Sequence, residues 1–284
     1  MTAKHQDDGG LIGILNERRA FMLWQRVVSA CIFVPFLLIS MFIGGIWWFA
    51  VDLLIICLAL KEYRDLLQKK NVELPLALMC ILSIVVLALQ CFEDGLLSGF
   101  GMLLTCIALI LWTFRKKAPF ASFSFSVSGM ILIAWSLSFL VNLRILNHTW
   151  WLVVLAFLIP WVTDTGAYAF GILFGKHKLA PVISPKKSWE GAIGGVLVCL
   201  LVLLLYNGLV LHYHWWFIVA LAILGSVLGQ LGDLLESWLK RWVDVKDSGH
   251  TIPGHGGILD RFDSMLLVAP VVYYALFIYQ HFVC

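Results

Sequence analysis

The stretch that decides the fold is residues 228–264, LGQLGDLLESWLKRWVDVKDSGHTIPGHGGILDRFDS. Apolar segments long enough to cross a bilayer flank it on both sides, although the stretch itself is dense in acidic and basic side chains. An ionisable group at membrane level is costly unless it faces a partner or a water-filled cavity, so such groups indicate a functional site. We therefore expect the chemistry of this protein to lie here, next to membrane-spanning helices.

The composition indicates an integral membrane protein. Of 284 residues, 61% are hydrophobic and 13% charged, and the mean hydropathy is +0.93, whereas soluble domains are about half apolar and a quarter charged. The net charge of +3 and the absence of a basic run with interleaved aromatic residues exclude a nucleic-acid-binding protein. The seven cysteines form no CxxC pair and indicate neither disulfides nor zinc. The predicted fold class is all-α and polytopic.

We expect about nine transmembrane helices, since each crossing needs roughly 20 apolar residues. The predicted spans lie near 27–43, 47–60, 74–91, 96–114, 121–146, 150–174, 189–211, 215–239 and 263–283. Gly44 and Gly45 provide a turn between the first two spans. The predicted organisation is a cytoplasmic tail at 1–25, N-terminal transmembrane helices at 26–149 and a C-terminal catalytic transmembrane domain at 150–284.

The distribution of basic residues predicts the orientation. If the nine spans alternate, every Lys and Arg except Arg144 falls on the same face of the membrane. Basic loops lie on the cytoplasmic side. The N-terminus is therefore predicted to be cytoplasmic.

The N-terminal helices show no pattern typical of catalysis. Asp52 lies within a predicted span, and we interpret it as a packed carboxylate or one at the membrane rim. We expect these helices to serve packing, lipid contact or dimerisation.

In the C-terminal half, the segment WVTDTGAYAFG places Asp164 in the middle of a span, between two threonines and before Gly166. An acidic residue beside small residues indicates a cavity, and the alternative is a helix–helix hydrogen bond. The loop that follows, GKHKLAPVISPKKSWEG, is rich in lysine and serine. Its ammonium groups can bind phosphates, although topology and anionic lipid also produce basic loops.

A row of polar residues precedes the glycine-rich loop. Gln230, Asp233 and Glu236 recur every three residues and share one helix face. This row is compatible with a proton relay, with salt bridges to Lys240 and Arg241, or with half of a metal site.

The loop GHTIPGHGGILDRFD favours the metal site. Its glycines allow backbone N–H groups to approach an anion. Asp260 and Asp263 then follow on one face of the next helix. Carboxylates without cysteine ligands favour Mg²⁺, which is usually held by one or two carboxylates plus substrate phosphates. Zinc is not expected, because Pro253 breaks the helical spacing between His250 and His255.

The segment 237–263 resembles the signature of the phosphatidate cytidylyltransferases, or CDP-diacylglycerol synthases. The matching positions are Ser237, Leu239, Lys240, Arg241, Lys246, Asp247, Gly249, Ile252, Pro253, His255, Gly256, Gly257, Ile258, Asp260, Arg261, Phe262 and Asp263. The GDLLES segment, the Asp164 segment and the lysine-rich loop are also similar to the family. The resemblance implies cytidylyl transfer from CTP to phosphatidate, dependence on Mg²⁺, a monovalent cation such as K⁺ and a homodimer.

The resemblance and the residue types together give predicted roles. The predicted metal ligands are Asp233 and Asp260. The predicted catalytic residues are Lys240, Arg241, Lys246, Asp247, His255, Arg261, Asp263 and Asp164. The predicted substrate-binding residues are Lys176, Ser184, Lys186, Lys187, Ser188, Gly254, Gly256 and Gly257.

Two other functions remain open at this point. A CTP-dependent lipid kinase, such as a polyprenol kinase, would transfer a γ-phosphoryl group instead. A proton-coupled secondary transporter would use Asp164, Asp233 and Asp260 as a proton path, but transporters commonly show two related halves, and no repeat is visible here. The compact length favours a bacterial inner (cytoplasmic) membrane, with the active site facing the cytoplasm.

Overall fold

The computed structural model describes residues 28–29, 31–92, 95–146, 149–249, 251 and 256–283. The predicted tail at 1–25 lies outside these residues. The elements are the helix Cys31–Ile43, followed by α2 (Gly45–Gln68), α3 (Leu76–Gln90), α4 (Gly95–Lys116), α5 (Phe120–Gly129), η1 (Met130–Trp135), α6 (Ser136–Ile145), α7 (Trp151–Phe174), β1 (Lys178–Ala180), β2 (Ser184–Ser188), α8 (Trp189–Tyr206), η3 (Asn207–Leu211), α9 (Trp215–Trp242), α10 (Leu259–Phe262) and α11 (Met265–Phe282).

Six helical segments within the described residues are long and apolar enough to cross a membrane. They are Gly99–Lys116, Phe120–Ile145, Trp151–Phe174, Trp189–Leu211, Trp215–Trp242 and Leu259–Phe282. Two further apolar helices, Cys31–Ile43 and Leu76–Gln90, are shorter. The all-α polytopic fold is therefore confirmed, whereas the count of nine spans and the cytoplasmic N-terminus stay predictions.

The predicted turn at Gly44 and Gly45 is confirmed. Both residues have positive φ angles, 66° and 56°, which glycine adopts without steric cost. The helix that follows, α2, was predicted to end near residue 60 but continues to Gln68. Its last two turns carry a charged segment, Lys61 to Asp65, so hydropathy alone gave the wrong end.

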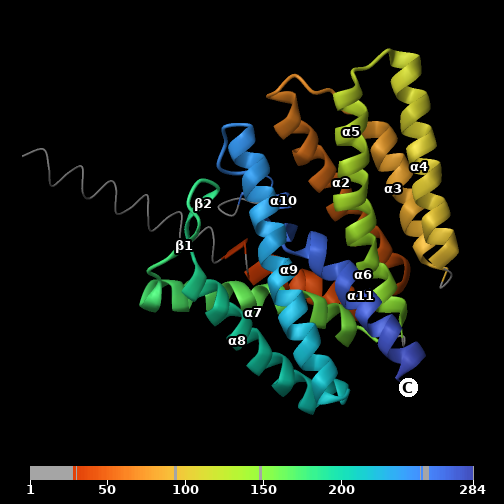
Figure 1. Ribbon diagram of the computed structural model, residues 1–284. Helices are drawn as coiled ribbons and strands as arrows, with labels where there is room; N and C mark the ends of the chain where they lie inside the picture. Colours follow the sequence, from red (N-terminus) through yellow and green to blue (C-terminus); the bar gives the residue numbers. More distant parts are fainter. Residues whose placement is uncertain are drawn as a thin grey trace, which may run out of the picture.

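The helices form two groups (Figure 1). The helices α3, α4 and α5 lie side by side, with α2 packed on α3, whereas α7, α8 and α9 pack against one another. The last long helix, α11, joins the groups because it contacts α6 as well as α7 and α9. The chain therefore brings its N-terminal helices against the C-terminal group that carries the signature.

Small residues set the closest helix contacts. A Cβ atom on Gly195 of α8 would lie only 2.7 Å from the carbonyl oxygen of Thr163 in α7. A Cβ atom on Gly232 of α9 would lie 2.6 Å from the carbonyl oxygen of Asp263. Helices approach this closely only where a side chain is absent. Gly232 therefore allows the joint between α10 and α11 to lie directly beside Asp233.

The lysine-rich loop contains a short β-hairpin that the sequence analysis did not foresee. Strands β1 and β2 are antiparallel, with Lys178 opposite Ser188 and Ala180 opposite Ser184. Hydropathy treats this segment only as a polar connection, because its backbone pairing is local and leaves no apolar periodicity. The hairpin holds the Lys186–Ser188 segment beside the start of α8 (Figure 1).

Candidate active site

A cavity of about 380 Å³ lies among α7, α8, α9 and the β-hairpin. Its lining includes Asp164 from α7, Lys186 and Lys187 from β2, and Gln230 and Asp233 from α9. The prediction that Asp164 faces a cavity is confirmed. Both signs of charge therefore meet in one hollow between membrane-spanning helices and the β-hairpin.

The acidic side of this cavity is paired with one lysine. The Asp233 carboxylate forms an ion pair with the Lys187 ammonium group, and the hydroxyl of Ser237 donates a hydrogen bond of 3.2 Å to Asp233 Oδ1. Asp164 lies close enough to Asp233 and Lys187 to interact with both electrostatically. We call Asp164, Lys187 and Asp233 the cavity wall.

The residues predicted to bind substrate in the lysine-rich loop divide into two sets. Lys186, Lys187 and Ser188 line the cavity, and Ser188 also caps α8, because its hydroxyl accepts a hydrogen bond of 3.2 Å from the backbone N–H of Gly191. Lys176 and Ser184 are not among the lining residues. Lys176 instead donates its backbone N–H to Glu190 at 3.1 Å.

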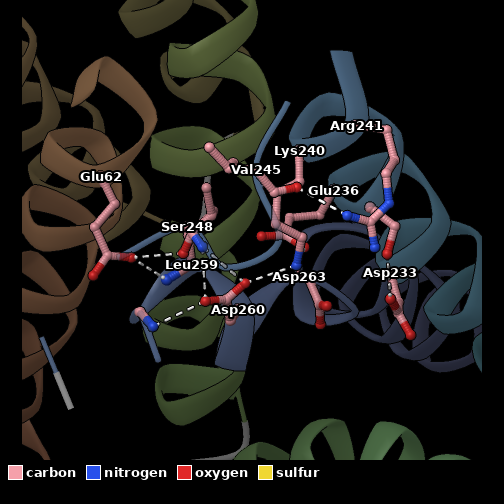
Figure 2. Close-up of polar contacts among 12 residues, drawn as sticks. Glu62, Asp233, Glu236, Lys240, Arg241, Val245, Ser248, Leu259, Asp260 and Asp263 are labelled. Atoms are coloured by element: carbon pink, nitrogen blue, oxygen red, sulfur yellow. Dashed lines mark hydrogen bonds and ion pairs between the residues drawn. The ribbon is translucent and has the colours of Figure 1, made fainter. Parts of the chain in front are cut away.

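A second charged group lies beside the cavity wall, around Lys240 (Figure 2). The Lys240 ammonium group forms an ion pair with Glu236 one turn earlier in α9. It also pairs with Asp260 Oδ1 at 2.7 Å. Glu236 is buried, with 3% of its surface exposed, so Lys240 compensates a carboxylate that has no access to water. Glu236 is thus a salt-bridge partner of Lys240, one of the alternatives that its spacing had left open.

Asp260 also organises the backbone of residues 248–259, which we call the signature loop. Its carboxylate accepts hydrogen bonds from the backbone N–H groups of Ser248 at 3.0 Å and Gly257 at 2.9 Å. Gly256 has φ +87°, and a Cβ atom there would lie 2.9 Å from Asp260 Oδ2. The glycine therefore serves both the left-handed backbone and the close approach of the carboxylate.

Asp263 belongs to the cavity-wall side of the site. Its carboxylate interacts electrostatically with those of Asp233 and Asp164, and its Oδ1 accepts a hydrogen bond of 2.5 Å from the backbone N–H of Ser264.

Asp233 and Asp260, the predicted metal pair, have different lysine partners, Lys187 and Lys240. Across the described ranges, no three Asp, Glu, His or Cys side chains are grouped so as to hold a metal ion by themselves.

The remaining predicted residues lie around this centre. Arg241 donates from Nη1 to the carbonyl of Val245 at 2.9 Å and from Nε to that of Ile183 at 3.3 Å, so it ties the hairpin to the turn after α9. Lys246 and Asp247 are exposed in that turn, and Arg261 interacts electrostatically with Asp164. Gly254 and His255 lie outside the described residues.

One residue of the site was missed. Glu62 of α2 is buried, with 4% of its surface exposed, and its carboxylate accepts hydrogen bonds from residues 248–259 of the signature loop. We call Glu62, Ser248, Gly257 and Asp260 the loop anchor. An acidic residue among the charges at the end of an apolar helix is ordinary in sequence, because Lys61, Arg64 and Asp65 lie beside it, so no sequence signal distinguished Glu62.

Comparison with known proteins identifies the family. A model of the cytidylyltransferase family matches residues 24–279. The chain belongs to this family.

The chain is also similar to curated proteins of this family. A phosphatidate cytidylyltransferase of Staphylococcus epidermidis is 36% identical over 252 residues, covering 87% of this chain and 94% of the relative. Proteins of the same name from Staphylococcus haemolyticus and Staphylococcus aureus are each 35% identical, with the same coverage of 87% and 94%. The family match spans the cavity wall and the loop anchor alike, so this cytidylyltransferase is related to its family through both halves of the chain.

Proposed function

We propose that this cytidylyltransferase transfers the cytidylyl group of CTP to phosphatidate, giving CDP-diacylglycerol and pyrophosphate. The relatives that cover most of the chain carry the name of that enzyme. The observation that carries the proposal is the cavity where Lys187 and Asp233 meet, between membrane-spanning helices and the β-hairpin. A phosphate donor from the aqueous side and a lipid head group from the membrane side can both reach such a position.

The reaction needs charge neutralisation more than proton transfer. A phosphate oxygen of phosphatidate attacks the α-phosphorus of CTP, a new P–O bond forms, and the bond to the β-phosphate breaks as pyrophosphate leaves. The second pKa of a phosphomonoester is about 6, so the attacking oxygen is already largely anionic at neutral pH. The protein must therefore bring two polyanions together, and fixed cations do this by positioning and electrostatic stabilisation.

The described residues suit that task. Lys186 and Lys187 lie in the cavity and are assigned to the triphosphate. Lys240, which pairs with Asp260, and Arg261, which interacts with Asp164, are assigned to the lipid phosphate or the departing pyrophosphate, as is the exposed Lys246. Arg241 acts through the backbone contacts that hold the hairpin. The backbone N–H groups near Gly256 and Gly257 belong to the loop that the loop anchor holds.

The donor set fits Mg²⁺. The carboxylates of Asp233, Asp263 and Asp164 interact with one another, and hard oxygen donors suit this ion. A site that needs one or two carboxylates plus substrate phosphates agrees with the lack of a three-ligand protein cluster in the described ranges. We assign Asp233 to the ion together with Asp260, as the sequence predicts, or with Asp263. The ion would neutralise the triphosphate; K⁺ is proposed as a monovalent cation from the family resemblance alone.

The deciding experiment uses purified protein in detergent with labelled CTP, phosphatidate and Mg²⁺. Formation of labelled CDP-diacylglycerol and pyrophosphate in equal amounts supports the proposal. CDP with a phosphorylated lipid would indicate a kinase instead. No lipid product, together with proton-coupled uptake in vesicles, would indicate the transporter.

We also propose a homodimer in a bacterial inner membrane with the active site facing the cytoplasm. The bacterial relatives and the basic residues near the cavity support this orientation, because basic loops remain on the cytoplasmic side. A single cysteine introduced at Lys246 of a cysteine-free variant in spheroplasts should react with a membrane-impermeant thiol reagent only after the membrane is opened. Labelling of intact spheroplasts would reverse the orientation, and a monomeric mass in native mass spectrometry would exclude the dimer.

A further inference from the structure

Glu62 connects the N-terminal helices to the signature loop by hydrogen bonds (Figure 2). It lies in α2, and almost two hundred positions separate it from its partners. Its side chain is nearly inaccessible, with 4% of the residue exposed. A buried carboxylate is costly unless it is hydrogen-bonded, so its contacts determine what it does.

Within the part of the chain that the structure describes, Glu62 accepts four hydrogen bonds, and all four come from residues 248–259. Oε1 accepts from the hydroxyl of Thr251 at 2.5 Å and from the backbone N–H of Ile258 at 3.0 Å. Oε2 accepts from the hydroxyl of Ser248 at 3.1 Å and from the backbone N–H of Leu259 at 2.8 Å. Two of these four donors are therefore the backbone N–H groups of Ile258 and Leu259, at the start of α10, the helix that carries Asp260.

Glycines of the signature make room for this carboxylate. A Cβ atom on Gly249 would lie 2.7 Å from Glu62 Oε1. A Cβ atom on Gly257 would collide with Glu62 Oε2 and with the hydroxyl of Ser248. Any larger residue at either position would displace Glu62 or the loop. The contact with α2 thus gives a physical reason for two glycines that substrate binding alone would not require.

Asp260 binds the backbone of the turn at residues 257–259 as well. Asp260 accepts hydrogen bonds from the backbone N–H groups of Ser248 and Gly257, while Glu62 binds the neighbouring donors of Ser248, Ile258 and Leu259. The loop backbone therefore lies between two carboxylates. Asp260 also forms the ion pair with Lys240 at 2.7 Å. The position of the Lys240 ammonium group therefore depends on the position of residues 257–259.

We propose that Glu62 is a positioning residue for cytidylyl transfer: it fixes the turn at 257–259 so that Asp260 and Lys240 are held in their reactive arrangement. It does not touch substrate itself. The N-terminal helices are then a required part of the active site rather than a packing or dimerisation module. This inference rests on the proposed function for its kinetic test, but the contact between Glu62 and the loop can be tested without it.

Replacing Glu62 by glutamine tests the contact sharply. An amide of the same shape has one oxygen acceptor, whereas its NH₂ group is a donor. A hydroxyl such as that of Thr251 can turn to accept a bond, but the backbone N–H groups of Ile258 and Leu259 cannot. In either orientation of the amide, one backbone N–H therefore faces another donor. Glu73→Gln is the matched control, because it makes the same change at an exposed glutamate just after α2.

For Glu62→Gln we expect kcat/KM for CTP to fall at least about tenfold, the usual range for residues that hold catalytic ligands in place. Hydrogen–deuterium exchange at the amides of residues 257–259 should become faster. Glu73→Gln should match the unmodified protein in both measurements. Unchanged exchange rates and an unchanged kcat/KM in Glu62→Gln would overturn the proposal. A fall in activity that is fully explained by a smaller amount of folded protein would overturn it as well.

A second pair of variants guards against misfolding. Thr251 is exposed, so Thr251→Val removes one donor to Glu62 with little risk to the fold, and Thr251→Ser restores the hydroxyl. We expect Thr251→Val to lower kcat/KM and speed amide exchange, and Thr251→Ser to recover both. No difference between valine and serine would contradict the positioning role. If the unmodified protein forms no CDP-diacylglycerol, the proposed function fails, whereas the exchange measurements still decide whether Glu62 holds the loop.

Discussion

The cavity wall and the loop anchor use the same type of side chain for different purposes. In the cavity wall, Asp164 and Asp233 face an open hollow and are balanced by Lys187 across the gap between a helix and the hairpin. In the loop anchor, Glu62 and Asp260 bind backbone N–H groups of the chain itself. A carboxylate whose acceptors are filled by the backbone is fixed, whereas one beside a cavity remains available to a ligand.

This difference indicates that the two groups of carboxylates have separate roles in the site. The anchor determines where the signature loop lies, and the wall presents charge to whatever enters the cavity. Lys240 stands between the two, because it pairs with Glu236 of α9 and with Asp260 of the loop (Figure 2). A substitution in the anchor should therefore affect order as well as activity, and one in the wall should affect activity alone.

The largest effect is expected for Asp260→Asn. The substitution removes the charge that pairs with Lys240. Because Oδ2 accepts both backbone N–H bonds, an amide that keeps its oxygen there turns its NH₂ group towards the Lys240 ammonium group, so transfer should be abolished while membrane insertion remains intact. Buried groups left unsatisfied in this way also cost about 1–3 kcal/mol of stability. Transfer is measured with labelled CTP and stability by thermal unfolding in detergent. Asp244→Asn is the control, and near-normal turnover of purified Asp260→Asn would contradict the role.

Asp233→Asn should reduce kcat by about 100-fold or more, as expected for removal of a preorganised electrostatic group. In contrast to Asp260→Asn, it should leave the unfolding temperature nearly unchanged, because Asp233 faces the cavity. The Mg²⁺ concentration needed for half-maximal activity should rise if Asp233 binds the ion. The same measurement on Asp263→Asn shows whether Asp263 is the second carboxylate of the site. The Mg²⁺ requirement should rise if Asp263 binds the ion and stay unchanged if it does not.

Asp164→Asn tests whether the far side of the cavity wall contributes to catalysis. We expect turnover to fall about tenfold, a smaller loss than at Asp233, because among the described residues Asp164 forms no direct ion pair and interacts with Asp233 and Lys187 only at longer range. The unfolding temperature should remain the same. Unchanged turnover with a lowered unfolding temperature would instead make Asp164 a packing residue.

Gly232→Ala tests how closely α9 and α11 must approach. The added methyl group would lie 2.6 Å from the carbonyl oxygen of Asp263, so the joint between α10 and α11 must shift. Such overpacking costs about 1–3 kcal/mol, and activity should fall severalfold because Asp263 moves away from Asp233. Gly208→Ala, where a Cβ atom would meet no neighbour within 4 Å, is the control. Equal stability of the two variants would contradict the close contact.

The smallest effect is expected for Asp244→Asn. Asp244 forms an exposed ion pair of 3.0 Å with Lys70, which also links the end of α2 to the segment after α9. Exposed pairs contribute about 0–1 kcal/mol, so stability and kcat should stay close to normal. A large loss of activity would show that the exposed pair is as important for catalysis as the buried loop anchor, and would contradict the difference that we draw between them.

Much of the fold followed from local pattern. Apolar length predicted the helices, and Gly44 and Gly45 predicted the turn before α2. Asp164, an acidic residue beside small residues within a predicted span, correctly indicated a cavity. The β-hairpin and the true end of α2 were missed, because neither leaves a signal in hydropathy.

The sequence by itself determined that this is a membrane protein of a cytidylyltransferase type, since hydrophobic length and the signature at 237–263 are carried by neighbouring residues. Only the tertiary structure decided which carboxylates are available and which are occupied. Asp260 is bound by Lys240 and by the backbone, and Glu62 reaches the loop from a distant helix. Contacts of that kind depend on how helices pack across the whole chain, so no local pattern of residues encodes them.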